Sequence, residues 1–446
     1  MLNKMLQAVE GYREDILAAE RHIWNNPEPG YKEWKTHAYM KEKFEELGYA
    51  VTEAGNIPGF WTDVDTGRPG PFVAVFGELD SLIVPTHPEC DPETGAVHAC
   101  GHHCQCAALL GVAAGLKAEG ALDGLSGKIR LIAVPAEELI EIGYRKTLKE
   151  QGVIRYFGGK QEFMYRGVLD GVDMSFMVHT SSVPGFRCSM GSNGCVIKEA
   201  TFRGKASHAG GAPHLGVNAL YAANCAMQAA NALRETFKDS DHIRFHPIIT
   251  AGGTAVNAIP DEVVVESYVR GATMEAIARE NKKINRAFAG GAAAMGAQVD
   301  LWDYHGYAPR EYDLNLREVM YQVGVEIMGE ENVNFNNNFD TGCSDMGDVS
   351  LVMPALHPTM GGSTGPAHSK DFNITDPIQA CVDSARVQCA ILERLLEKDA
   401  AAAKDIIARP RKDYLTIPDY LAMVDSLSLD RQAVTYREDG GVELNF

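Results

Sequence analysis

A thiol and an imidazole stand two residues apart in the stretch His98-Ala99-Cys100-Gly101-His102-His103-Cys104. Both groups are good ligands for Zn²⁺ and for its neighbours in the first transition row. A helix rich in small residues is expected to start near Gln105, so Cys100 and His102 can reach one metal ion from a single turn before that helix. Cysteines and histidines also lie together simply to pack, so other parts of the chain must decide between the two interpretations.

Four further polar features fall at the ends of predicted strands or in a loop that can reach them. They are Glu78-Leu79-Asp80 after the apolar run 72–76, Pro135-Ala136-Glu137-Glu138 after the run 128–134, His179 after the run 174–178, and His368 in the turn-rich loop 365–369. Open parallel sheets place their sites at the carboxyl ends of strands. A lone strand-end histidine or a first-turn Glu pair is often only structural, but the convergence of these features with Cys100 and His102 favours a metal centre.

The adjacent carboxylates of Glu137 and Glu138 repel each other unless a positive charge lies beside them. A metal ion would supply that charge. One carboxylate can then bind the metal, while the other lies close enough to a nearby water to accept its proton.

Strands alternating with helices predict a mostly parallel α/β layer structure for the first part of the chain. After Pro184-Gly185 the pattern changes to alternating strands around 195–203, 262–270 and 298–304, separated by helices. We therefore expect an α/β domain formed by residues 1–192 and 308–446, interrupted by a smaller α+β domain at 193–307. The tail after residue 401 suggests no function.

Composition and charge limit the partners of the protein. The chain of 446 residues carries a formal net charge of −19, which disfavours nucleic acid and anionic membranes as partners. No secretion signal opens the sequence, and no run of about 18 apolar residues could span a membrane. We expect a cytoplasmic protein whose 10 cysteines stay reduced.

These residues resemble the M20 metallopeptidases, and specifically the amidohydrolase branch that carries a bridging Cys. The resemblance runs from about Arg21 to Glu393, and its strongest motifs are His98-Ala99-Cys100-Gly101-His102 and Pro135-Ala136-Glu137-Glu138. Within the branch, Gly77-Glu78-Leu79-Asp80 and Ser344-Asp345-Met346-Gly347-Asp348-Val349-Ser350 look most like the aminobenzoyl-glutamate hydrolase group. The resemblance implies a di-metal hydrolase domain with an inserted lid and dimerisation domain.

The resemblance also implies roles for single residues. Cys100 would bridge two divalent metal ions, Zn or Mn. Glu138 and His368 would complete the coordination of one ion, and His102 and His179 would complete that of the other. Glu137 would be the general base and Asp80 would orient a ligand. The family usually has Asp or Asn after the ligand histidine, and this chain has His103, so a ligand swap between His102 and His103 stays open.

The inserted domain resembles the family's lid. Gly204-Lys205-Ala206-Ser207-His208-Ala209-Gly210 matches the pattern whose His reaches the substrate carbonyl oxygen, usually from the partner subunit. The loop 252–261 matches a loop of the family whose Asn contacts the substrate carboxylate, and that Asn is Asn257 here. Arg270 stands where members of the family often have an Arg that also contacts the carboxylate. These residues imply a homodimer, which we expect to form through the edge strand 195–203 and the helix 218–232.

The leading functional hypothesis is hydrolysis of an amide bond next to a free carboxylate. The substrate would be a small N-acyl or aroyl amino acid of the aminobenzoyl-glutamate kind, or a dipeptide. Two alternatives remain from the residues: a metal-binding or peptide-binding module without catalysis, and a structural zinc protein with a thiol redox switch. The presence of Glu137 argues against the first, because an inactive site does not need a proton acceptor beside the metal.

Overall fold

The computed structural model describes residues 2–410 and 414–446, so Met1, with which the first predicted helix opens, lies outside the described part. The chain divides into two compact units. The first contains residues 1–191, 311–339 and 348–417, and the second contains residues 192–310, 340–347 and 418–446. The sequence placed 340–347 and the whole tail with the first domain, whereas 340–347 and residues 418–446 of the tail group with the second unit.

The first unit is built on a six-stranded sheet with the order β1-β2-β6-β3-β7-β19. Strand β3 runs parallel to β6 on one side and to β7 on the other, and β19 is parallel to β7. Only β1 and β2 run antiparallel, at one edge. The bounds are β1 Thr52–Glu53, β2 Phe60–Asp65, β3 Phe72–Glu78, β6 Lys128–Val134, β7 Met174–Phe176 and β19 Ala355–Leu356. The mostly parallel α/β sheet is thus confirmed.

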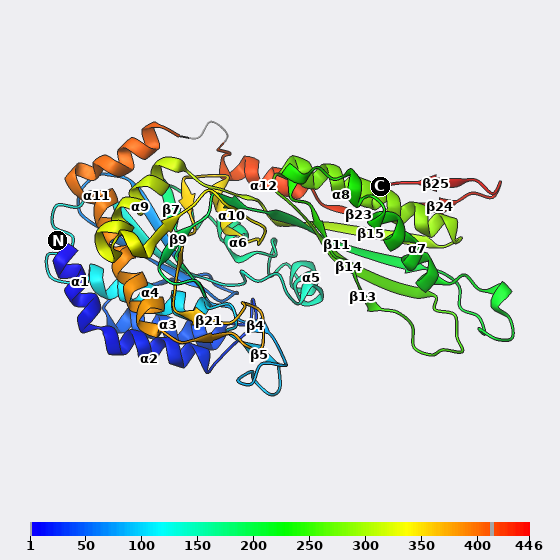
Figure 1. Cartoon of the computed structure of the whole chain (residues 1–446), viewed down its shortest axis with the longest axis horizontal. Helices are drawn as coiled ribbons and strands as arrows, with labels where there is room; N and C mark the ends of the chain where they lie inside the picture. Colours follow the sequence, from blue (N-terminus) through cyan, green and yellow to red (C-terminus); the bar gives the residue numbers. More distant parts are fainter. Residues whose placement is uncertain (1, 411–413) are drawn as a thin grey trace. The chain divides into compact units, whose positions relative to one another are not determined.

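Helices and short strands surround this sheet (Figure 1). The helices are α1 Leu2–Gly11, α2 Arg13–Trp24, α3 Trp34–Glu46, α4 His102–Leu116, α5 Ile142–Glu150, α6 Gly159–Tyr165, α9 Leu314–Met328 and α11 Ser384–Ala408, with a π-helix at Ile378–Asp383. A second sheet has the order β17-β9-β20-β8, with bounds β8 His179–Thr180, β9 Phe186–Cys188, β17 Val333–Phe335 and β20 Thr359–Met360. Two strand pairs complete the unit: β4 Leu82–Ile83 with β5 Ala96–Val97, and β21 Ser363–Thr364 with β22 Asn373–Ile374.

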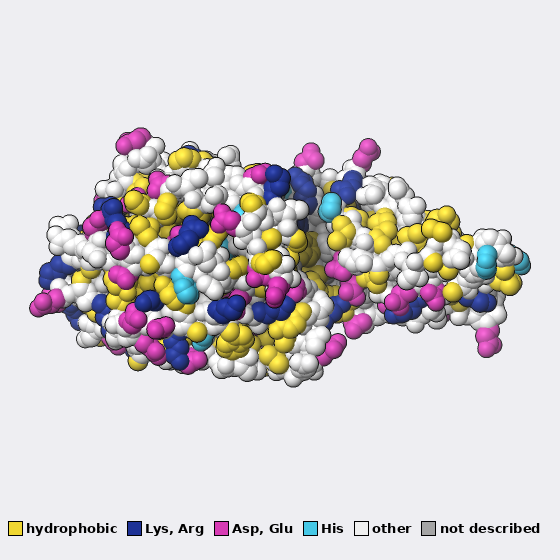
Figure 2. All heavy atoms as spheres, turned by 90° about the horizontal axis from the view of Figure 1, so that it is seen from below, with side chains coloured by type: hydrophobic (Ala, Val, Ile, Leu, Met, Phe, Trp, Pro, Cys, Tyr) yellow, Lys and Arg dark blue, Asp and Glu magenta, His cyan; other side chains and the backbone are white. Residues whose placement is uncertain are grey.

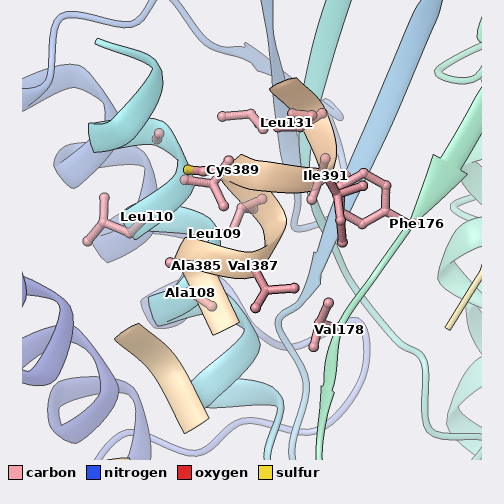
Figure 3. Packing of buried hydrophobic residues seen from close by; sticks show 14 of the residues in the cluster. Ala108, Leu109, Leu110, Leu131, Phe176, Val178, Ala385, Val387, Cys389 and Ile391 are labelled. Carbon is pink, nitrogen blue, oxygen red and sulfur yellow. The ribbon is translucent and has the colours of Figure 1, made fainter. Parts of the chain in front are cut away.

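Helix α4 is the centre of the core of the first unit. Every one of its residues is buried, because it packs against β3 and also against helices α1, α2 and α11. Figure 3 shows Ala108, Leu109 and Leu110 of α4 beside side chains of α11. Small residues permit this close packing: a Cβ on Gly111 would lie only 2.7 Å from Cβ of Ala385. The sequence showed the small-residue helix, but it begins at His102, so His102 and His103 form its first turn rather than preceding it.

The second unit is an antiparallel sheet with the order β12-β14-β11-β15-β23, to which β13 adds by pairing with β14. The bounds are β11 Gly194–Arg203, β12 Arg244–Phe245, β13 Ile248–Ala251, β14 Glu262–Gly271, β15 Gln298–Tyr307 and β23 Leu429–Gln432. Helices α7 Ala219–Asn231 and α8 Met274–Ala294 pack against each other and on the sheet. The hairpin β24 Val434–Tyr436 and β25 Val442–Leu444 closes the chain.

Two expectations about the second unit are wrong. Strand β11 is not an edge strand, because it is paired with β14 on one side and with β15 on the other. Residues 418–446 of the tail are part of this unit, because β23 pairs with β15 and because Ala433 and Val434 are buried in its core. Five elements include residues at which the chain leaves one unit and enters the other. They are β10 Gly191–Ser192, β16 Arg310–Glu311, β18 Phe339–Asp340, α10 Met346–Ser350 and α12 Ile417–Ser426.

The surface carries charged side chains of both signs, as the composition of the chain leads one to expect (Figure 2). Figure 2 shows acidic and basic side chains interspersed on one face of the molecule, so that face carries no single charged patch. No helix in the described part of the chain combines the length and the apolar character needed to cross a membrane.

Candidate metal centre

The parallel strands bring the two acidic motifs to one edge of the sheet. Strand β3 ends at Glu78, which lies opposite Val134, the last residue of β6. The chain then turns sharply, since Ala136 has a left-handed backbone with φ of 56°. That conformation is strained for a residue with a side chain, and the carboxylate of Glu33 stabilises it by accepting a hydrogen bond from the Ala136 amide at 2.7 Å. The turn directs Glu137 and Glu138 to the edge at which Asp80 follows β3.

Cys100 and His102 are placed at the start of α4 by a glycine. Gly101 has φ of 101°, and a Cβ there would lie 2.8 Å from Cβ of Thr180. A side chain at this position would therefore push α4 away from β8, the strand that contains His179. Sγ of Cys100 consequently lies 3.4 Å from Nε2 of His179.

Two groups of potential metal ligands share Cys100. The first group is Cys100, His102 and His179, and the second is Cys100, Glu138 and His368. Within each group the ligand atoms all lie within 4.8 Å of one another. The structure thus brings together the five residues that the sequence singled out as ligands.

The loop that contains His368 is tied to the cysteine motif through its backbone. The His368 amide donates a 2.9 Å hydrogen bond to the carbonyl of Ala99, the residue before Cys100. His368 itself has a left-handed backbone with φ of 63°, and its side chain is half exposed. Its Nε2 atom lies 3.2 Å from Oε1 of Glu138. The loop therefore holds an accessible imidazole beside the side chain of Glu138 and next to the Cys100 motif.

The electrostatics of the two groups favour a thiolate among cationic partners. Burial alone would raise the pKa of Cys100, but the charges of His102 and His179 outweigh burial and hold that pKa well below its usual range. Hydrogen bonds to Cys100 and Glu138 raise the pKa of His368 to about 11. Burial raises the pKa of Glu138, and the negative charge of Cys100 adds to this effect. A cation among these groups would relieve the repulsion between thiolate and carboxylate.

Asp80 positions a ligand of each group. Nδ1 of His102 lies 2.9 Å from the Asp80 carbonyl oxygen and 3.2 Å from Oδ1 of the same residue. The other carboxylate oxygen of Asp80 accepts the Glu138 amide at 2.8 Å. Burial would raise the pKa of Asp80, but these hydrogen bonds and the His102 charge lower it to about 2. Asp80 thus holds Nδ1 of His102 and leaves Nε2 to face the site.

The donor set fits a divalent metal. Nε2 of His102 is buried and makes no hydrogen bond with any residue that the structure describes. Carboxylate oxygens of Glu78 and Glu137 nevertheless lie 3.2 and 3.8 Å from it. Because Asp80 holds Nδ1 and Nε2 makes no hydrogen bond within the described part of the chain, Nε2 of His102 is placed to bind a metal ion. Thiolate and imidazole ligands suit zinc, and carboxylates also suit manganese.

Two polar residues beside the site were not found from the sequence. Lys160 of α6 is completely buried, and its Nζ lies 2.5 Å from Oε1 of Glu78. Gln105 of α4 donates to the other oxygen of Glu78 at 2.8 Å. Burial would raise the pKa of Glu78, but the charges of Lys160 and His102 lower it. No local pattern marks Lys160, since a lysine near the start of a helix is usually exposed to solvent.

His103 lies in a different group from His102. Its Nε2 atom is 3.2 Å from a carboxylate oxygen of Glu20 and 3.4 Å from Sγ of Cys104, and its ring packs edge-on against Trp24. The structure therefore places His102, and not His103, with Cys100.

The second unit holds the other three candidates. His208 and Asn257 lie on neighbouring exposed loops, since His208 forms a β-bridge with Ala258 and the Ala209 amide donates to the Asn257 carbonyl at 2.9 Å. Nδ1 of His208 accepts hydrogen bonds from the amides of Gly210 and Gly211. That leaves Nε2 of the exposed ring available to a ligand. Arg270 is partly buried on β14, and its Nη1 donates to Sγ of Cys343 at 3.5 Å.

Comparisons with known proteins give the class to which this fold and site belong. Residues 190–294 match the M20 peptidase dimerisation domain. The chain is 29% identical to the Xaa-Arg dipeptidase of Mus musculus, over 91% of this chain and 88% of that protein. It is 30% identical to the thermostable carboxypeptidase 2 of Saccharolobus solfataricus, over 60% of this chain and 67% of that protein.

Solved structures show the same fold. A putative aminohydrolase from methicillin-resistant Staphylococcus aureus has a TM-score of 0.71 at 23% identity, covering 88% of this chain and 99% of that one. The YXEP protein of Bacillus subtilis, described as a dinuclear metal-binding peptidase of the M20 family, has a TM-score of 0.65 at 19% identity, covering 87% and 99%. The chain belongs to the M20 family of metal-dependent peptidases and amidohydrolases. It is therefore a hydrolase, as the resemblance implied.

Proposed function

We propose that this protein hydrolyses an amide bond next to a free carboxylate, using two divalent metal ions. The observation that carries this proposal is that Cys100 belongs to both ligand groups while the carboxylate of Glu137 lies beside them. One ion would be held by Cys100, His102 and His179, and the other by Cys100, Glu138 and His368. Two ions held there would lower the pKa of a water molecule and polarise the substrate carbonyl.

Glu137 is the residue that would move the proton. It is buried, and its Oε2 atom lies 3.8 Å from Nε2 of His102. It would take a proton from the attacking water and return it to the leaving amine nitrogen. Asp80 would keep His102 and Glu138 in place during both transfers, through the hydrogen bonds described above.

The exposed loops of the second unit would bind the substrate. His208 would donate to the carbonyl oxygen, where negative charge develops. Asn257 and Arg270 would bind the free carboxylate, which a net charge of −19 otherwise repels. A guanidinium is well suited to this role because it can bind a carboxylate with two hydrogen bonds.

Two substrate classes fit this arrangement equally well. One is an N-acyl or aroyl amino acid of the aminobenzoyl-glutamate kind, which follows from the motifs around Glu78 and Asp345. The other is a dipeptide, which is supported by the similarity to an Xaa-Arg dipeptidase over most of both chains. Both classes place a free carboxylate next to the amide that is cleaved.

A hydrolysis screen tests the proposed function. Protein loaded with Zn²⁺ or Mn²⁺ is assayed on N-acyl amino acids, aminobenzoyl-glutamate and dipeptides, including Xaa-Arg dipeptides. The matched control for each substrate is its C-terminal amide. We expect kcat/KM for the amide to be lower on the order of 10- to 100-fold, since a charged hydrogen bond is lost. Loaded protein that cleaves none of these substrates, or cleaves the amides equally well, contradicts the proposal.

We further propose that the protein is a homodimer that pairs through β13 and α7. The residues of β13 are all exposed, and Ile248 and Ile249 are 50% and 41% exposed. Tyr221 on α7 is 60% exposed. An unpaired edge with apolar side chains is a template for pairing with a second copy. The match of residues 190–294 to a dimerisation domain supports this partner.

Subunit mixing tests whether His208 serves the partner's site. An inactive His208→Ala variant is mixed with an inactive Glu137→Gln variant under conditions that exchange subunits. If His208 acts in trans, one site of each heterodimer contains both substitutions and the other contains neither. The heterodimer should then regain up to about half of the wild-type activity, because one of its two sites is intact.

The control for this experiment is each variant taken through the same exchange alone, which should stay inactive. Exchange itself is verified by mass spectrometry of differently labelled subunits. Proven exchange without any recovery of activity would show that His208 serves its own chain.

A further inference from the structure

Two cysteines of the second unit meet beside two arginines. Cys195 lies near the start of β11, directly opposite Arg270 of β14. Cys343 comes from the segment 340–347, which the chain returns to this unit. The thiols of Cys195 and Cys343 lie close enough to influence each other's pKa, and Nη1 of Arg270 donates to the sulfur of Cys343 at 3.5 Å.

The two sulfurs differ in exposure and in charge. Cys195 is buried, with 1% of its surface exposed, whereas Cys343 is partly exposed. The hydrogen bond from Cys195 and the charges of Arg270 and Arg310 hold the pKa of Cys343 below its usual range, against the opposing effect of burial. The hydrogen bond that Cys195 donates and its burial raise the pKa of Cys195 well above its usual range. A partly exposed thiol with a lowered pKa beside a buried thiol with a raised pKa is the arrangement of a peroxide-reactive cysteine and its resolving partner.

The backbone is irregular at both cysteines of the pair. The register of β11 against β15 shifts between Cys195 and Val196, so the pairing of the two strands is irregular at Cys195. Cys343 stands in a loop without regular structure, between β18 and α10. Arg310 is held by hydrogen bonds to residues other than the two cysteines, since its guanidinium donates to Ser192 at 2.5 Å and to Asp340 at 3.2 Å. A segment without regular secondary structure thus places Cys343 near the irregular start of β11, with Arg310 held beside it by its own partners.

We propose that Cys343 and Cys195 form a peroxide-sensitive thiol pair, in which Cys343 reacts first and Cys195 then closes a disulfide. In the first step the Cys343 sulfur attacks one peroxide oxygen, a sulfur–oxygen bond forms and the oxygen–oxygen bond breaks. Cys343 is oxidised to a sulfenic acid, and the peroxide is reduced to water after taking up a proton. In the second step the Cys195 sulfur attacks Cys343, the sulfur–oxygen bond breaks, and hydroxide leaves as water with the Cys195 proton.

Disulfide formation would change the charge beside Arg270. In the reduced protein the Cys343 sulfur accepts a hydrogen bond from this guanidinium, and its lowered pKa favours the negatively charged form, whereas the disulfide is neutral. The effect on the substrate rests on the proposed function, in which Arg270 binds the substrate carboxylate. Oxidation then frees the guanidinium for the substrate. We therefore expect oxidation to lower KM for a carboxylate substrate by several-fold while kcat stays the same, and a thiol reductant to reverse the change.

Peptide mapping tests the thiol pair directly. Reduced, metal-loaded protein is treated with hydrogen peroxide, its free thiols are alkylated, and it is digested without reductant. We expect a peptide that links Cys195 to Cys343. The Cys343→Ser variant should form no such link, and the Cys195→Ala variant should instead accumulate a sulfenic acid at Cys343 that dimedone traps. The control is Cys225→Ser, which removes another partly exposed thiol of the same unit and should leave the link intact.

Two results would overturn the thiol pair. One is oxidation of Cys343 no faster than that of Cys225, and the other is a disulfide that forms elsewhere, as between the buried thiols Cys104 and Cys381. Far-ultraviolet circular dichroism and metal content show whether each variant has folded. The peptide mapping of the wild-type protein tests the disulfide even if a variant does not fold. A Cys195–Cys343 disulfide that leaves KM unchanged would uphold the thiol pair and contradict the role proposed for Arg270.

Discussion

The Glu137→Gln variant should bind metal and fold like the wild-type protein but lose kcat by a factor on the order of 10²–10⁴. The amide of Gln fills the same volume as the carboxylate, so packing at the end of β6 should not change. It cannot accept a proton from water, however, and that transfer is the step assigned to Glu137. The measurement is steady-state hydrolysis at saturating substrate, together with metal content by elemental analysis.

The matched control for this variant is Glu141→Gln. Glu141 lies four residues further along the chain, where its carboxylate pairs with Lys32 at 2.6 Å on a partly exposed surface. Removing that charge should change activity little, because exposed ion pairs contribute about 0–1 kcal/mol. If Glu137→Gln and Glu141→Gln had the same near-normal kcat, Glu137 would not be the general base.

The Cys100→Ser variant should lose both metal ions and, with them, a factor of at least about 10³ in kcat/KM. Both ligand groups contain Cys100, so a single substitution weakens two sites at once. A serine hydroxyl stays protonated at neutral pH, whereas the Cys100 thiol has a strongly lowered pKa and can bind as a thiolate. Metal ions contribute several kcal/mol of transition-state stabilisation, which corresponds to a rate loss of this size.

Metal content per chain and kcat/KM are both measured for Cys100→Ser, after dialysis and after addition of excess Zn²⁺ or Mn²⁺. Cys90→Ser is the matched control, because Cys90 is a partly exposed thiol of the same unit outside both ligand groups. That variant should keep both ions. A Cys100→Ser protein that retained two ions and full activity would mean that Cys100 does not bridge them.

The sequence by itself was sufficient to predict the type of sheet and to group the polar residues that follow its strands. Apolar runs such as 72–76 and 128–134 are local signals of buried strands, and neighbouring parallel strands end at one edge. Polar residues that follow these runs must therefore converge, which is why Asp80, Glu138 and His179 could be grouped from the order of residues alone. The spacing of Cys100 and His102 is equally local, since one glycine separates them.

Only the tertiary structure decided how these residues are held and which of their neighbours take part. Lys160 reaches Glu78 from a helix 82 residues away in the chain, and no periodic pattern records such a contact. The separation of His103 from His102 depends on α2, which brings Glu20 and Trp24 against one side of α4. Similarly, β11 became a central strand because β14 and β15 pair with its two edges. Long-range pairing and burial decide these features, and neither depends on the residues next to each other in sequence.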